Sequence, residues 1–154
     1  MSAISSTYSF KDSAASITNP VLAGAPIVLA GEIGMGEFII SMHTERTVHD
    51  VAADGTVMPS YMAGDNGAVT IMVQQTSIVH IELLALYNLL KIAADSGDVS
   101  NWAATAISIR NTVDGSQHLL TGVSFSKIPD KTYAAQGGRL SWVLMAASIV
   151  NFNA

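Results

Sequence analysis

The chain has no cysteine among its 154 residues. A disulfide framework, a thiol nucleophile and a cysteine-based zinc site are therefore excluded. A secretion signal is also missing, because Met1–Ser6 contains no basic region followed by an apolar core. We expect a soluble protein that is made in the cytoplasm.

Charged residues are scarce as well. Asp, Glu, Lys and Arg make up 12% of the chain, against about a quarter in typical proteins, while 49% of the residues are hydrophobic. The net charge is −5, so the sequence predicts no basic face that would bind a nucleic-acid backbone. Low charge fits either a well-packed domain rich in Ala and Ser, or a surface that lies largely in subunit interfaces, where charge is depleted.

No catalytic or metal-binding pattern emerges from the polar residues. His43 and His49 do not have a zinc-ligand spacing, and His80 and His118 have no neighbour that suggests a catalytic triad. The glycine-spaced segment Gly31–Gly36 lacks the Gly-Lys-Ser/Thr ending of a phosphate-binding loop. The carboxylates are scattered, and no spacing selects an acid/base pair. We predict no catalytic residue, no metal, no cofactor and no enzyme activity.

The segment Gly67–Gly97 organises the rest of the chain. Val69, Ile71 and Val73 alternate with more polar residues, which predicts a strand with one buried face. A helix over about 78–96 follows, and Gly97 is a suitable C-terminal stop. The residues expected to form its core-facing side are Leu83, Leu86, Tyr87 and Leu90.

That helix is apolar around most of its circumference. We therefore expect it to be covered nearly all round, either as the plug of a β-structure or as an element shared with a neighbouring subunit. Its apolar run is shorter than the ~20 residues that cross a bilayer, and it carries Glu82 and Lys91. No membrane span is predicted.

Alternating segments on both sides of the helix predict further strands. They lie at Thr7–Asp12, with a bend near Ala14, and at 38–42, 105–110, 119–125 and 139–144, with a loop at Ile128–Gly138. Strands before and after one helix favour a mostly β (α+β) class, with an antiparallel sandwich or half-barrel and one packed helix. The length fits a single domain spanning 1–154.

The segment 44–62 is the least globular in its pattern. Asp54-Gly55 lies between two short apolar stretches and predicts a hairpin with a two-residue turn. We expect a projecting arm that contacts a partner, the alternative being a solvated surface loop. The candidate contact residues of the arm are Arg46, Val51, Asp54, Gly55, Val57, Met58 and Tyr61.

Five segments, taken in order, resemble a known family. They are Thr7-Tyr8-Ser9-Phe10-Lys11-Asp12, Ala53-Asp54-Gly55-Thr56-Val57-Met58, Leu86-Tyr87-Asn88, Ala106-Ile107-Ser108-Ile109-Arg110, and Tyr133-Ala134-Ala135-Gln136-Gly137-Gly138 leading into Ser141-Trp142. Their order and spacing resemble the tail tube subunits of contractile-tailed phages over nearly the whole chain. The stretch Pro20–Gly36 matches poorly, so nothing is carried over there.

The resemblance implies a structural role. Six copies would close into a ring, and rings would stack into a tube through which genome DNA passes without sequence-specific binding. The implied partners are other copies of the chain and the tail sheath, baseplate and tail terminator proteins, in a virion tail assembled in the host cytoplasm. A wall that lets DNA pass should carry more Asp and Glu than Lys and Arg, since basic groups would grip phosphates; the lining residues are not predicted.

Two alternatives remain open at this point. The first is a tube subunit of a type VI secretion-like contractile apparatus, which is built in the same way. The second is a small non-enzymatic β-domain that binds a ligand or glycan, which would show a pocket with convergent polar groups.

Overall fold

The computed structural model describes residues 7–30 and 34–153. The elements, in chain order, are η1 (Phe10–Asp12), β1 (Ser13–Thr18), η2 (Pro20–Leu22), β2 (Ile27–Ala30), β3 (Met35–Met42), β4 (Thr47–Val51), β5 (Val57–Tyr61), β6 (Gly67–Gln74), α1 (Ile78–Asp95), β7 (Thr105–Asn111), β8 (Ser116–Lys127) and β9 (Arg139–Asn153). Within these residues, a sheet with the strand order β2-β1-β7-β8-β9-β6-β3 forms the body, and β4 and β5 form a separate ribbon. Every strand pair in both is antiparallel.

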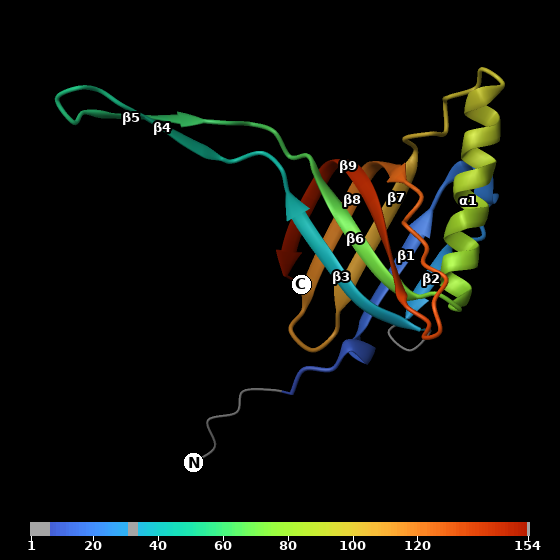
Figure 1. Cartoon of the computed structure of the whole chain (residues 1–154). Helices are drawn as coiled ribbons and strands as arrows, with labels where there is room; N and C mark the ends of the chain where they lie inside the picture. The colour runs from blue at the N-terminus through green and yellow to red at the C-terminus, as the bar shows by residue number, and fades with distance from the viewer. Residues whose placement is uncertain (1–6, 31–33, 154) are drawn as a thin grey trace, which may run out of the picture.

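The large sheet curls into a half-barrel, and α1 lies along one side of it (Figure 1). The core fills the space between them, with inward residues of the strands packed against the buried face of the helix. The predicted class, mostly β with one packed helix, is confirmed, and a curled half-barrel is the form that it takes.

The unit of β6 and α1 forms for local reasons. Val69, Ile71 and Val73 are fully buried on one face of β6, as their alternation requires. The hydroxyl of Ser77 caps the helix by accepting a hydrogen bond from the Val79 amide at 3.2 Å. Gly97 ends the helix with a φ of 101°, a left-handed conformation that costs glycine little.

A chain of aromatic side chains ties the helix to the sheet. Trp142 in β9 is fully buried and packs edge-on against Phe125 in β8 at 5.5 Å between ring centroids. Phe125 in turn contacts Tyr87 of α1 at 5.5 Å, and Tyr87 contacts Trp102 in the linker after the helix at 6.2 Å. Such pairs add stability beyond the area that they bury.

Two predicted boundaries were wrong. The segment Thr7–Asp12 is not a strand: Phe10–Asp12 forms a 3-10 turn, and the strand begins at Ser13. The apparent alternation there has a different cause, since Phe10 stacks on Phe38 of β3 at 5.6 Å.

The last strand runs on to Asn153 instead of ending near 144. Its apolar alternation changes phase between Ala146 and Ile149, both buried, where it passes Gly122 of β8. Gly122 has a φ of 63°, and a β-carbon there would come within 2.7 Å of the Ala147 side chain. The pairing of β8 with β7 shifts register beside Gly122, and this irregularity hides the period of two from the sequence pattern.

Candidate functional site: surfaces for assembly

The sheet ends in two open edges. Within the described residues, β2 and β3 each pair with a neighbour on one side only. The unpaired N–H and C=O groups of an edge strand can pair with another chain. On β3 the side chains of Ile39 and Met42 are also exposed, by 43% and 38%.

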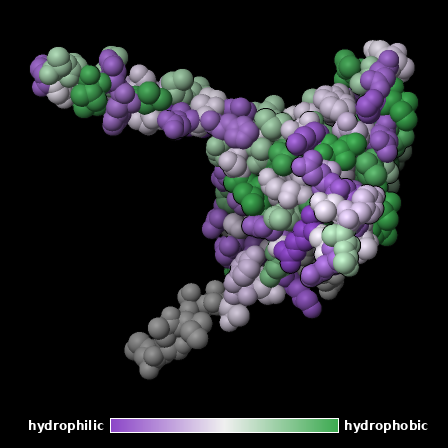
Figure 2. Space-filling model, viewed as in Figure 1, coloured by the Kyte–Doolittle hydropathy of each residue, from purple (hydrophilic) through white to green (hydrophobic). Residues whose placement is uncertain are grey.

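The β4–β5 ribbon projects far from the body as an arm (Figures 1 and 2). Every residue of both strands is exposed. At its base, Arg46 pairs with Asp65 at 2.7 Å and donates to the Met62 carbonyl at 2.8 Å. The arm is therefore anchored where it leaves the body. The Arg46 guanidinium also lies over the Tyr61 ring, 5.6 Å from its centroid, while every residue of both strands stays exposed.

The tip of the arm differs from the predicted turn. The Gly55 amide donates to the Ala52 carbonyl and the Ala52 amide donates to the Thr56 carbonyl, both at 2.9 Å. Gly55 has a φ of 89°, whereas Asp54 does not have a positive φ. The two-residue prediction was wrong, because these bonds define a three-residue loop that ends in a left-handed glycine.

The Asp54 side chain stabilises that loop. One of its oxygens accepts a hydrogen bond from the Thr56 amide at 2.9 Å. This bond holds the pKa of the Asp54 carboxyl below its ordinary value. Asp54 therefore has a local role in shaping the tip.

The two faces of the arm differ in character. Directly paired residues share a face, so Val51 lies beside Val57 on one face and Asp50 beside Met58 on the other. The first face also carries the pairs Thr47–Tyr61 and His49–Pro59. Of the arm residues named from the sequence, Val51, Val57 and Tyr61 thus lie on the first face and Met58 lies on the opposite face. The exposed strand residues Val48, His49 and Pro59 were not among those named, although the alternation of residues on both sides of the loop could have indicated them.

Helix α1 is buried on one side only. Leu83, Leu86 and Leu90 are at most 1% exposed, and Tyr87 is half-buried. The opposite side carries an exposed apolar stripe, here called the outer stripe, of Ile78, Ile81, Leu89 and Ile92, exposed by 55%, 63%, 48% and 68%. The expectation that the helix is covered nearly all round does not hold within one chain, because the sheet reaches only one side of it (Figure 1).

The face of the sheet turned away from α1 is rich in small and hydroxyl side chains. Thr70 pairs with Val143 and Ser16 pairs with Ser108 on this face. The charged residues that alternate onto it from the described strands are Glu37, Arg110, Lys127 and Arg139. Basic groups thus outnumber acidic ones on this open face.

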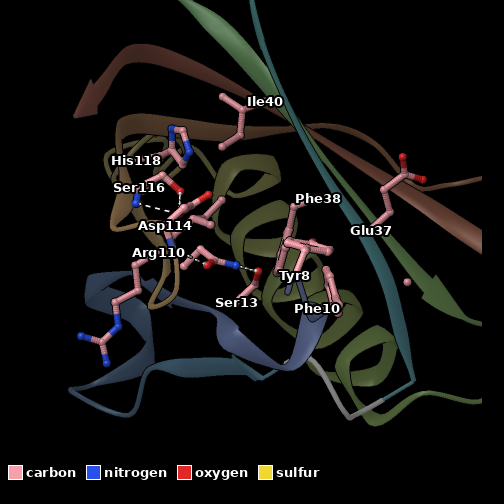
Figure 3. A pocket seen from close by; sticks show the side chains of 13 residues that line it. Tyr8, Phe10, Ser13, Glu37, Phe38, Ile40, Arg110, Asp114, Ser116 and His118 are labelled. Atoms are coloured by element: carbon pink, nitrogen blue, oxygen red, sulfur yellow. Dashed lines mark hydrogen bonds between the residues drawn. The ribbon is translucent and has the colours of Figure 1, made fainter. Parts of the chain in front are cut away.

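A hollow of about 380 Å³ lies between β3 and the end of β7 (Figure 3). Hydrogen bonds join some of the polar groups of its lining: Asn111 donates to Ser13 at 2.8 Å, and Ser116 donates to Asp114 at 2.7 Å. Figure 3 shows the Arg110 guanidinium directed away from the hollow. The arrangement offers no nucleophile beside a base and no set of polar groups converging on a ligand.

The described residues form neither a metal cluster nor a membrane-spanning helix. Among residues 7–30 and 34–153, no three His, Asp or Glu side chains gather in a way that could hold a metal ion. No helix in that part of the chain is long and apolar enough to span a membrane. The surfaces that leave backbone groups unpaired or apolar side chains exposed are therefore the two edges, the arm and the outer stripe.

Comparison with known proteins identifies the family. The family of the bacteriophage PhiTE tail tube protein matches residues 5–152. The chain belongs to this phage tail tube family. The resemblance inferred from the ordered segments is thereby confirmed, and the protein is a structural component of a phage tail.

Solved structures with the same fold come from contractile injection systems. A chain in the cryo-EM structure of the PVC sheath–tube complex in the extended state is 11% identical, with a TM-score of 0.58 over 99% of this chain and 95% of that chain. A chain in the PVC sheath/tube terminator structure in the extended state is 10% identical, with a TM-score of 0.56 over 97% and 99%. A chain in the baseplate structure of the anti-feeding prophage is 9% identical, with a TM-score of 0.58 over 97% and 98%.

At these identities the likeness concerns the fold. No curated protein matches the sequence. The family is that of a phage tail tube protein, and the PVC chains that share this fold belong to an extracellular contractile injection system.

Proposed function

We propose that six copies of this chain close into a ring, that rings stack into the tail tube, and that the tube conducts the phage genome during ejection. The observation that carries the proposal is the presence of two open edges, β2 and β3, at opposite ends of one curled sheet in a tail tube protein. Pairing β3 of one copy with β2 of the next removes both edges only when the ring closes. Such a head-to-tail contact produces a closed ring when the rotation from each copy to the next adds up to a full turn.

The low charge of the chain supports the same assembly. Obligate interfaces bury roughly 2,000 Å² or more and are apolar. The outer stripe and the exposed valines of the arm supply apolar surface that one chain leaves in water. The role we propose is structural and not catalytic, with the arm residues contacting adjacent subunits.

The orientation in the tube follows from the two faces of the sheet. We place α1 on the outside, toward the sheath, and the open face toward the bore. That face carries more basic than acidic groups among its described strand residues, contrary to the acidic wall expected from the sequence. A reconstruction of the tube that shows which of Glu37, Arg110 and Arg139 line the bore tests this placement directly.

The further partners that we propose are the other proteins of a phage tail. Sheath, baseplate and tail terminator proteins would contact the tube, and assembly would take place in the host cytoplasm. The solved relatives are chains of sheath–tube, terminator and baseplate structures, which supports this set of partners. DNA would pass through without sequence-specific contacts.

Negative-stain electron microscopy of the purified protein, with light scattering, tests the proposal. Rings or tubes with sixfold end views are the expected result. A monodisperse monomer at every concentration would contradict it and would favour a small ligand-binding domain. A tube of a secretion-type apparatus would look alike in this experiment, but the family match favours the phage tail.

A further inference from the structure

An apolar groove runs between α1 and β2. It has a volume of about 460 Å³ and is lined by Leu22, Pro26 and Ile27 on one side and by Ala85 and Leu89 on the other. Pro26 is exposed and Leu89 is 48% exposed. Glu82 is the one charged residue of the lining. A groove of this kind can receive an apolar segment that also brings a hydrogen-bond donor for the carboxylate.

The arm has the complementary chemistry. Its first face presents Val51, Val57, Pro59 and Tyr61, with His49 as the basic residue among them. Val51 is 63% exposed and Tyr61 is 75% exposed. A two-stranded ribbon is marginally stable alone in water, so this face requires a partner to stay ordered.

We propose that this face of the arm docks into the α1–β2 groove of the next copy in the ring, with His49 against Glu82. The inference rests on the proposed ring. The valines and Pro59 cover the apolar lining, and the imidazole N–H donates to the Glu82 carboxylate. One basic group thus meets one acidic group inside an otherwise apolar contact.

The topology brings the two surfaces together. The chain passes from the end of β3 at Met42 into the arm at Thr47, and β2 itself lines the groove. If β3 of one copy pairs with β2 of the next, the two strands run parallel, because every step across the sheet is antiparallel. The arm then leaves the sheet at the C-terminal end of that copy's β2, and it reaches the groove at the start of β2 by lying back along α1. Figure 1 shows the arm and α1 on opposite sides of the molecule, so the arm cannot fill the groove of its own chain. The contact is head-to-tail, as a ring requires.

Cysteine cross-linking tests the contact cleanly, because the chain has no cysteine of its own. We expect the double variant Val57→Cys, Ala85→Cys to assemble when reduced and, on oxidation, to give a ladder of covalent oligomers in non-reducing gels. The matched control, Val57→Cys with Ser141→Cys on the open face, should give no ladder. Tubes that form without the Val57–Ala85 cross-link would overturn this inference and leave the proposed function intact. Absence of any assembly by the unmodified protein would overturn both.

A charge exchange gives a second readout that does not depend on cysteine geometry. His49→Glu places two carboxylates together and should raise the concentration needed for assembly by about tenfold or more, since like charges in an interface cost several kcal/mol. Combining it with Glu82→Lys should restore assembly. Ser60→Glu, which adds the same charge on the opposite face of the arm, should have little effect. Equal loss in His49→Glu and Ser60→Glu, with no rescue by Glu82→Lys, would contradict the docking.

Discussion

The indole nitrogen of Trp142 donates a hydrogen bond to Nδ1 of His80 at 3.1 Å, inside the core. Nδ1 must therefore carry no proton, and the ring is held in its neutral form. Burial lowers the pKa of His80 from its ordinary value of 6.5, and the positive charge of Lys131 lowers that pKa further. Protonation would set two donors against each other and break this bond between helix and sheet.

Stability should consequently fall on mild acidification. The unfolded chain takes up a proton on His80 near pH 6.5, while the folded chain resists it, so stability is complete above that pH and is lost as pH falls through the lower folded pKa. Urea unfolding of the subunit between pH 5 and 8 measures the slope, where about 1.4 kcal/mol corresponds to each unit of pKa difference. His80→Gln retains an acceptor for Trp142 without titrating, so this variant should lose the slope; an unchanged slope would show that other groups cause it.

The two sides of α1 should respond differently to the same substitution. Leu86→Asp buries a carboxylate without a partner and should cost about 3–5 kcal/mol, which is enough to prevent folding. Leu89→Asp lies on the outer stripe, so the subunit should fold normally but assemble poorly. Circular dichroism and urea titration report folding, and electron microscopy reports assembly. Equal losses of stability in both variants would contradict the assigned faces.

Removing the tip of the arm should separate folding from assembly. Deletion of residues 53–55 removes a loop that packs against nothing in the described body, so the stability of the subunit should change by less than about 1 kcal/mol. Tube growth should stop, as seen by electron microscopy and light scattering. Asp54→Asn, which keeps an oxygen for the Thr56 amide, is the control and should assemble. Normal tubes from the deletion variant would count against a role for the tip.

The exposed edge strand depends on close packing at one glycine. A β-carbon on Gly67 would overlap the carbonyl oxygen of Ser41 in β3. Gly67→Ala should therefore push β3 away from β6, cost about 2–4 kcal/mol and abolish ring formation. Gly137→Ala meets no neighbour within 4 Å and should behave as the unmodified protein. Thermal unfolding of the two variants is a direct comparison, and equal stability would refute the packing argument.

Sequence reasoning succeeded where a local pattern and the tertiary structure require the same thing. The helix expected at about 78–96 occupies Ile78–Asp95, because apolar spacing, the Ser77 cap and Gly97 all agree. It failed where tertiary contacts override the pattern. Phe10 alternates with its neighbours but stacks on a distant strand, and the register irregularity beside Gly122 conceals the second half of β9.

The candidate surfaces could be predicted only in part from the sequence. Asp54-Gly55 located the arm, but the loop type and the division of the arm into two faces depend on strand register, which the pattern left undetermined. The groove beside β2 could not be foreseen, since Pro26 and Leu89 are 63 positions apart and line one groove only when the sheet curls against α1.

The fact that every copy carries the same edges, arm and outer stripe has a consequence for how long a tail can grow. Each ring added to a stack exposes the same binding surfaces as the ring beneath it, so the last ring binds a further ring as strongly as the first one did. Identical subunits of this kind do not limit the number of rings that are added. Tails of uniform length would then require other molecules that set the length and end the growth of the tube. This chain by itself should yield polymers of every length.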